Sequence, residues 1–131
     1  MNQENEERRV SDHRVMIVVS RDEQWLNFAE KTLRRTDQVK ALHGLEGASE
    51  KLTGIQGTRF LLVSSELVPA KVKDFQAFLD SGRFERVCVL KEFHDEHQRI
   101  SDKHLRELGI IVVDRPDNSK AFHRLLKMVC A

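Results

Sequence analysis

The chain lacks the features that mark secreted and membrane proteins. It has only two cysteines, Cys88 and Cys130, and these lie far apart in apolar surroundings without CxxC spacing. No apolar stretch resembles a signal peptide, and the apolar residues, 40% of the total, form no uninterrupted run of membrane-spanning length. We therefore expect a soluble protein of a reducing cytoplasm. Cys88 is expected to be a small buried apolar residue of the core.

An excess of one charge is also missing. The 22 basic and 21 acidic side chains give a net charge of +1, which creates no general attraction for nucleic acids or anionic membranes. The basic pairs Arg8-Arg9 and Arg34-Arg35 are short and have no interleaved aromatic residues that could stack on bases. Glycines are scattered, and none form a phosphate-binding loop after the first apolar run. We expect no nucleic-acid partner, no membrane and no cofactor.

The sequence contains one domain preceded by a polar tail. Residues 1–13 contain a single apolar side chain, Val10, and are expected to form a flexible tail. Residues 14–131 have the length of one domain and alternate short β-branched runs with segments of helical spacing. The runs predict strands at residues 15–19, 38–43, 59–64, 86–90 and 110–113.

Helices are predicted between these strands and after the last one. Asp22 or Ser20 caps the first helix, in which Trp25 is a core anchor, and Ala48 and Leu52 lie in a short second helix. The third helix follows Pro69 and ends at Gly82; the fourth covers residues 95–108, with Leu108 facing inward and Gly109 as its cap. Pro116 and Asp117 open the fifth helix, which has a clean apolar stripe.

This alternation predicts an α/β fold. Parallel strands joined by right-handed helical crossovers give a flavodoxin-like (βα)5 sandwich of three layers, with strand order 2-1-3-4-5. Ligands of such folds bind beyond the carboxyl ends of the strands, at the switch point between the first and the third strand. The residues that follow the strands are therefore the candidates for a site.

The predicted strands are followed by Ser20, Arg21 and Asp22 after the first, Ser65 after the third, Lys91 after the fourth and Arg115 and Pro116 after the fifth. With these residues at the strand ends, the chain resembles the receiver domains of bacterial two-component response regulators. The resemblance covers residues 14 to 130. Ser20-Arg21-Asp22 matches the acidic segment that holds magnesium in that family, and Ser65, followed four residues later by Pro69, matches the phosphorylated aspartate and its proline. Lys91 stands at the usual Thr or Ser, and Arg115-Pro116 stands at the usual Lys-Pro. The resemblance implies a receiver-like fold.

The same residues depart from the chemistry of that family. Ser65 offers a neutral hydroxyl with no base nearby in the sequence, so phosphorylation there is not expected. Replacing acids with Ser20 and Arg21 disfavours Mg²⁺. We therefore interpret the chain as a pseudo-receiver with a degenerate phospho-acceptor pocket, in which basic side chains pair internally with Asp22 and Glu66; its members are Ser20, Arg21, Asp22, Ser65, Lys91 and Arg115.

We predict no catalytic residue, no enzymatic activity and no metal. His94, His97 and His104 have helical spacing that zinc could use, but a solvated helix face explains them as well. The expected function is a phosphorylation-independent signalling module of a bacterial regulatory pathway that binds another regulatory protein or a second copy of itself. The partner face implied by the resemblance comprises His97, Ser101, His104, Lys120 and Arg124.

Two alternatives stay open at this stage. Polar residues at strand ends can simply cap helices in a flavodoxin-like domain that is not a receiver. Such a domain could also bind a nucleotide or another small ligand, or act as an enzyme, through an anion pocket formed by Asp22, Lys91 and Arg115.

Overall fold

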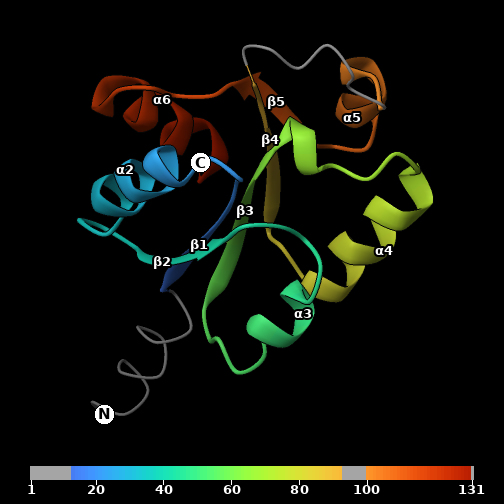
Figure 1. Cartoon of the computed structure of the whole chain (residues 1–131), viewed down its shortest axis with the longest axis horizontal. Helices are drawn as coiled ribbons and strands as arrows, with labels where there is room; N and C mark the ends of the chain where they lie inside the picture. Colours follow the sequence, from blue (N-terminus) through green and yellow to red (C-terminus); the bar gives the residue numbers. More distant parts are fainter. Residues whose placement is uncertain (1–12, 93–99, 131) are drawn as a thin grey trace, which may run out of the picture.

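The computed structural model describes residues 13–92 and 100–130. It forms a five-stranded, all-parallel sheet in the order β2-β1-β3-β4-β5 (Figure 1). The strands are β1 (Arg14–Val19), β2 (Gln38–Leu42), β3 (Thr58–Ser64), β4 (Arg86–Lys91) and β5 (Ile111–Asp114). The helices are α2 (Glu23–Leu33), α3 (Ala48–Lys51), η1 (Ser65–Leu67), α4 (Val72–Gly82), α5 (Asp102–Glu107) and α6 (Ser119–Val129). The predicted fold class and strand order are confirmed.

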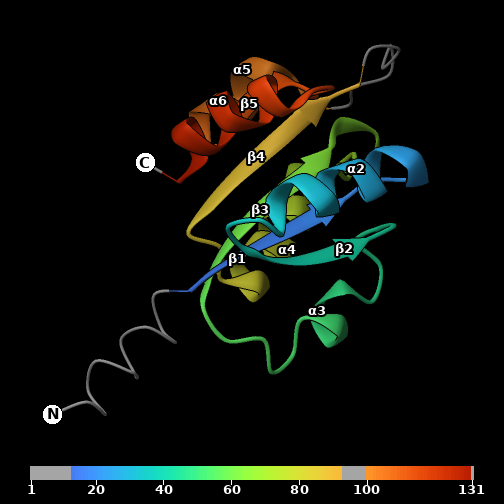
Figure 2. The same cartoon turned by 90° about the vertical axis from the view of Figure 1, so that its left-hand side faces the viewer.

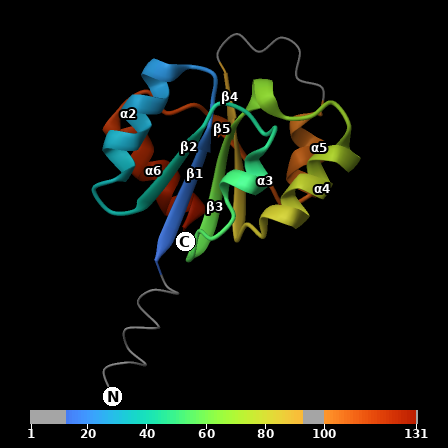
Figure 3. The same cartoon turned by 60° about the horizontal axis from the view of Figure 1, so that its bottom comes forward.

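Helices cover both faces of the sheet, which explains why β1, β3 and β4 are continuously apolar. Helices α2 and α6 lie side by side on one face, and α3, α4 and α5 cover the other (Figures 2 and 3). Alternate residues of β1 divide between the two cores, with Ile17 packing towards α3, α4 and α5 and Met16 towards α2 and α6. Each core therefore uses the same central strands.

The predicted end of the third helix at Gly82 is confirmed, whereas two predicted helix starts differ in detail. Gly82 is the last residue of α4 and is buried against Phe84, and the left-handed residue after the helix is Arg83, with φ of 51°. Pro69 lies in the loop before α4, because Lys71 is the residue that precedes its first turn. The last helix begins at Ser119, since the Asn118 side chain accepts a hydrogen bond from the Ala121 backbone at 2.9 Å.

The fourth predicted helix is only partly within the described residues. Helix α5 begins after Ser101, whose hydroxyl accepts a hydrogen bond from the His104 backbone, and Gly109 has the expected positive φ of 81°. Leu108 was expected to face inward and is instead 38% exposed, because the helix ends at Glu107 and the chain turns there. His94 and His97 lie outside the described residues.

The described residues include no helix that combines the length and apolar character needed to cross a membrane. Cys88 is buried in β4, and burial raises the pKa of its thiol to about 12. This agrees with the predicted role of Cys88 as a small core residue. Cys130 is half-buried, and burial likewise raises the pKa of its thiol.

Candidate functional site

Three buried serines lie where the central strands end. Ser20 follows β1, Ser64 ends β3 and Ser65 begins η1. Each hydroxyl has a partner: that of Ser20 accepts a hydrogen bond from the Asp22 backbone at 3.1 Å, and that of Ser64 donates to the Glu92 carboxylate at 2.8 Å. The Ser65 hydroxyl accepts from the Glu92 backbone at 3.1 Å. Buried hydroxyls are thus satisfied by the protein itself, and Ser65 is engaged in holding the end of β4.

Arg115 is the centre of the strand-end cluster. Its Nη1 lies 3.1 Å from Asp22 Oδ2 and 3.0 Å from Glu92 Oε2, and its Nε lies 3.5 Å from Asp117 Oδ1. The guanidinium also lies over the Trp25 ring, 5.5 Å from the ring centroid. We call Asp22, Ser64, Glu92 and Arg115 the strand-end network, because hydrogen bonds and ion pairs connect them in one chain from α2 to β3.

The backbone explains why Arg115 reaches this position. Its N–H donates to the Lys91 carbonyl at 3.1 Å, which extends the pairing of β4 with β5 by one residue. The following carbonyl, that of Pro116, accepts the Trp25 indole N–H at 2.8 Å in a buried hydrogen bond. The loop after β5 is therefore fixed both to β4 and to α2.

Asp22 serves both the helix and the network. Its Oδ1 accepts the Trp25 backbone N–H at 3.1 Å and so caps α2, while Oδ2 faces Arg115. The hydrogen bond from Trp25 and then the Arg115 guanidinium lower the pKa of Asp22 below its ordinary value of 3.8, more strongly than burial raises it. The carboxylate is charged at neutral pH.

Lys91 does not join this cluster. Its ammonium lies 2.9 Å from Asp102 Oδ2 in the first turn of α5, and that hydrogen bond raises the pKa of Lys91. Arg21 and Glu66 are exposed, and neither forms an ion pair within the described part of the chain. Of the predicted pocket, the structure therefore brings together Ser20, Asp22, Ser65 and Arg115, whereas Arg21 is exposed and Lys91 pairs with Asp102.

Glu92 is the member that sequence reasoning missed. Glu92 follows Lys91 directly, so its position after β4 made it a candidate for the site. The alternation of side chains along a strand does not decide, at the strand's end, which of two charged neighbours turns inward. The Glu92 side chain is only 12% exposed, against 36% for Lys91. The inward residue is therefore the acid.

The cluster has a surplus of negative charge. Three carboxylates, those of Asp22, Glu92 and Asp117, surround the single guanidinium of Arg115. An incoming anion would have to displace these carboxylates, so the predicted anion pocket of Asp22, Lys91 and Arg115 is not formed. No group of three His, Cys, Asp or Glu side chains within residues 13–92 and 100–130 is arranged to hold a metal ion.

The described members of the predicted partner face lie on either side of β5. Ser101 and His104 belong to the start of α5, and Lys120 and Arg124 are exposed on α6. His97 is outside the described residues. Of these exposed side chains, Lys120 and Arg124 are cationic.

Comparison of the chain with protein-family models, with curated proteins and with solved structures gives no match.

Proposed function

We propose that the chain is a receiver-like signalling module that works without phosphorylation and acts in the cytoplasm by binding another regulatory protein. The observation that carries this proposal is the strand-end network. It occupies the edge of the sheet where flavodoxin-like folds bind their ligands, and it fills that edge with the protein's own ion pairs.

The chemistry of the network supports a fixed state. The Glu92 carboxylate accepts a hydrogen bond from Ser64 and forms an ion pair with Arg115, while the Glu92 backbone N–H donates to Ser65. A carboxylate held by a hydroxyl and a guanidinium is a weak nucleophile, and no carboxylate or imidazole of the described residues is hydrogen-bonded to the Ser65 hydroxyl. The loops after β3, β4 and β5 are thereby connected without a phosphoryl group.

A direct test is to expose the full chain to acetyl phosphate, and separately to beryllofluoride with Mg²⁺, and to follow backbone amide shifts by NMR. We expect no saturable change at residues 20–22, 64–66 or 115. Saturable shifts confined to these residues, or a phosphorylated Ser65 in the mass spectrum, would show that the site is chemically competent and would overturn the proposal.

The binding surface that we propose is the exposed side of α5, β5 and α6 that carries Lys120 and Arg124. Its charge fits an acidic partner surface, because Lys120 and Arg124 have no ion-pair partner within the described part of the chain. Charge reversal by Lys120→Glu with Arg124→Glu should abolish capture of the partner from a lysate of the native cells. Lys51→Glu with Lys73→Glu, on α3 and α4, is the matched control and should leave capture intact.

The competing function is a nucleotide- or small-ligand-binding domain. A thermal-shift screen of nucleotides separates the two, because a ligand present at 100 times its Kd stabilises the folded protein by about 2.7 kcal/mol. Stabilisation that is lost on Arg115→Gln would favour the ligand-binding function.

A further inference from the structure

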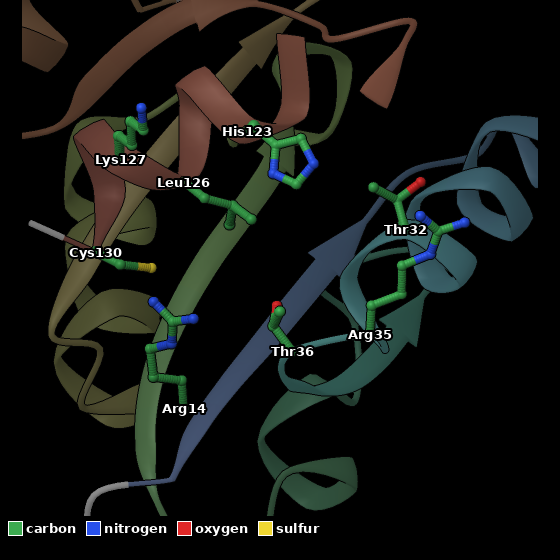
Figure 4. A pocket seen from close by; sticks show the side chains of 8 residues that line it. All are labelled: Arg14, Thr32, Arg35, Thr36, His123, Leu126, Lys127 and Cys130. Atoms are coloured by element: carbon green, nitrogen blue, oxygen red, sulfur yellow. The ribbon is translucent and has the colours of Figure 1, made fainter. Parts of the chain in front are cut away.

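A hollow at the opposite end of the sheet has a different character from the strand-end network. It lies between the last turns of α2 and α6, beside Arg14 at the start of β1, and has a volume of about 530 Å³ (Figure 4). That volume is in the range of small-molecule sites. We call it the basic hollow.

Cationic and other nitrogen-bearing side chains line two walls of the basic hollow, and its positive charge comes from Arg35 and Lys127. Arg35 follows α2, and His123 and Lys127 lie on α6. Figure 4 shows the Arg35 guanidinium beside Thr32 on one side and the His123 ring directed towards the gap from the other. None of Arg35, His123 and Lys127 has a hydrogen bond or ion pair within residues 13–92 and 100–130, so their donors are available.

The other charges nearby are compensated. Arg14 Nε lies 2.6 Å from Asp37 Oδ1, and that carboxylate is 1% exposed. Arg34 pairs with Glu30 at 3.3 Å. Arg35 and Lys127 therefore remain as two uncompensated positive charges at the basic hollow. The strand-end network, at the other end of the sheet, has instead a surplus of negative charge.

The floor of the basic hollow is apolar. Leu126 and Cys130 are half-buried residues of α6 and its end, and the Thr32 hydroxyl already donates to the Phe28 carbonyl at 2.9 Å. A ligand that fits must therefore present an anionic group to the walls and an apolar body to the floor.

The arrangement of the donors favours phosphate over carboxylate. One arginine fork satisfies a planar carboxylate, as Arg14 does for Asp37. Donors that approach from two helices suit a tetrahedral group with three terminal oxygens. We propose that the basic hollow binds a phosphate monoester of a small molecule with an apolar body, independently of the strand-end network and of the proposed signalling function.

The test uses the full chain and backbone amide NMR at low and at high salt. Phenyl phosphate is the probe, inorganic phosphate lacks the apolar body, benzoate carries a carboxylate and benzyl alcohol has no charge. We expect saturable shifts with phenyl phosphate at residues 32–37 and 123–130, weaker binding of inorganic phosphate and of benzoate, none of benzyl alcohol, and loss of affinity in high salt.

Variants then assign the binding to the cationic side chains. Arg35→Gln with Lys127→Gln should weaken binding roughly tenfold or more, since each removes a charged hydrogen bond. Arg35→Lys should keep part of the affinity, and Lys51→Gln with Lys73→Gln, which removes the same charge elsewhere, should change it less than twofold. These exposed positions should leave the far-ultraviolet CD spectrum unchanged.

Each of the following results would overturn the proposal. One is the lack of saturation by phenyl phosphate, and another is equal affinity for benzoate. The third is unchanged affinity in the variant that lacks both Arg35 and Lys127 cations, or shifts centred on Arg115 instead of the basic hollow.

Discussion

Arg115 combines two ion pairs with a cation–π contact. Its guanidinium pairs with Asp22 and Glu92 at once, and its flat face lies over Trp25. The side chain is 23% exposed, so these contacts are partly shielded from water and from salt. A lysine in the same position could keep the charge near Asp22 and Glu92, which both face Nη1, but it could not reproduce the Nε contact with Asp117 and the stacking on Trp25.

Replacement of Arg115 by Gln should lower the free energy of unfolding by about 1–3 kcal/mol, because the mostly buried Glu92 carboxylate loses its charged partner. Arg115→Lys should lose less. Urea denaturation followed by far-ultraviolet CD measures both, with Arg106→Gln on the exposed side of α5 as a control that should stay within about 0.5 kcal/mol of the parent. Equal stability of Arg115→Gln and the control would mean that the network contributes nothing.

Asp22 should make a contribution to the free energy of unfolding that depends on pH. Its pKa is lower in the folded chain than the ordinary 3.8, so its contribution is complete above pH 5 and is lost as the pH falls through the folded value. Asp22→Asn keeps a capping oxygen but cannot titrate. The stability difference between the parent and Asp22→Asn should therefore shrink from pH 7 to pH 3 in urea titrations. A difference that is constant or grows in acid would contradict the assignment.

Sequence spacing identified part of this site because strand ends of a parallel sheet meet at one edge. It could not select Glu92 over Lys91, since the direction of a side chain past the last paired residue depends on what lies nearby. Lys91 found Asp102 on α5, which is a contact between segments that no local pattern predicts.

At the scale of elements, glycines stand at the ends of two helices for two different reasons. Gly109 follows α5 with a φ of 81°, and an added Cβ would meet nothing within 4 Å, so the requirement there is conformational. Gly82 is the last residue of α4, where an added Cβ would clash with the Phe84 ring, so the requirement there is space. The sequence shows a glycine near both helix ends, but packing against Phe84 cannot be deduced from spacing.

Because Arg83, not Gly82, takes the left-handed conformation after α4, Arg83→Gly should raise the free energy of unfolding by roughly 0.5–1 kcal/mol. Gly109→Ala should lower it by about 1 kcal/mol for the opposite reason. Thermal and urea unfolding of both variants provide the measurement. A destabilised Arg83→Gly would show that the arginine side chain contributes more than its backbone costs.

For the whole molecule, the fold was the most predictable property. The apolar runs of β1, β3 and β4 have no polar alternation, and this pattern requires helices on both faces. Two cores result, but the strands between them are shared, so neither core can be removed without exposing the other face of the sheet. The chain should therefore unfold as one unit.

Ile17→Ala and Met16→Ala remove fully buried side chains from opposite faces of β1 and should each lower the free energy of unfolding by about 2–5 kcal/mol. Each variant should still show a single transition in scanning calorimetry, with equal calorimetric and van't Hoff enthalpies. Two separate transitions in either variant would indicate that the cores unfold independently.

Trp25 gives the chain a built-in optical reporter. It is the single tryptophan in a sequence without tyrosine, its indole N–H is bonded to the Pro116 carbonyl, and the Arg115 cation lies over its ring. Light absorbed at the red edge of the protein band excites this ring alone, and its emission responds to a charge so close. Anything that draws Arg115 away from the strand-end network should therefore shift that emission, whereas a molecule seated in the basic hollow, at the far end of the sheet, leaves those contacts in place. One unlabelled fluorescence spectrum can thus distinguish occupancy of the two ends of the molecule.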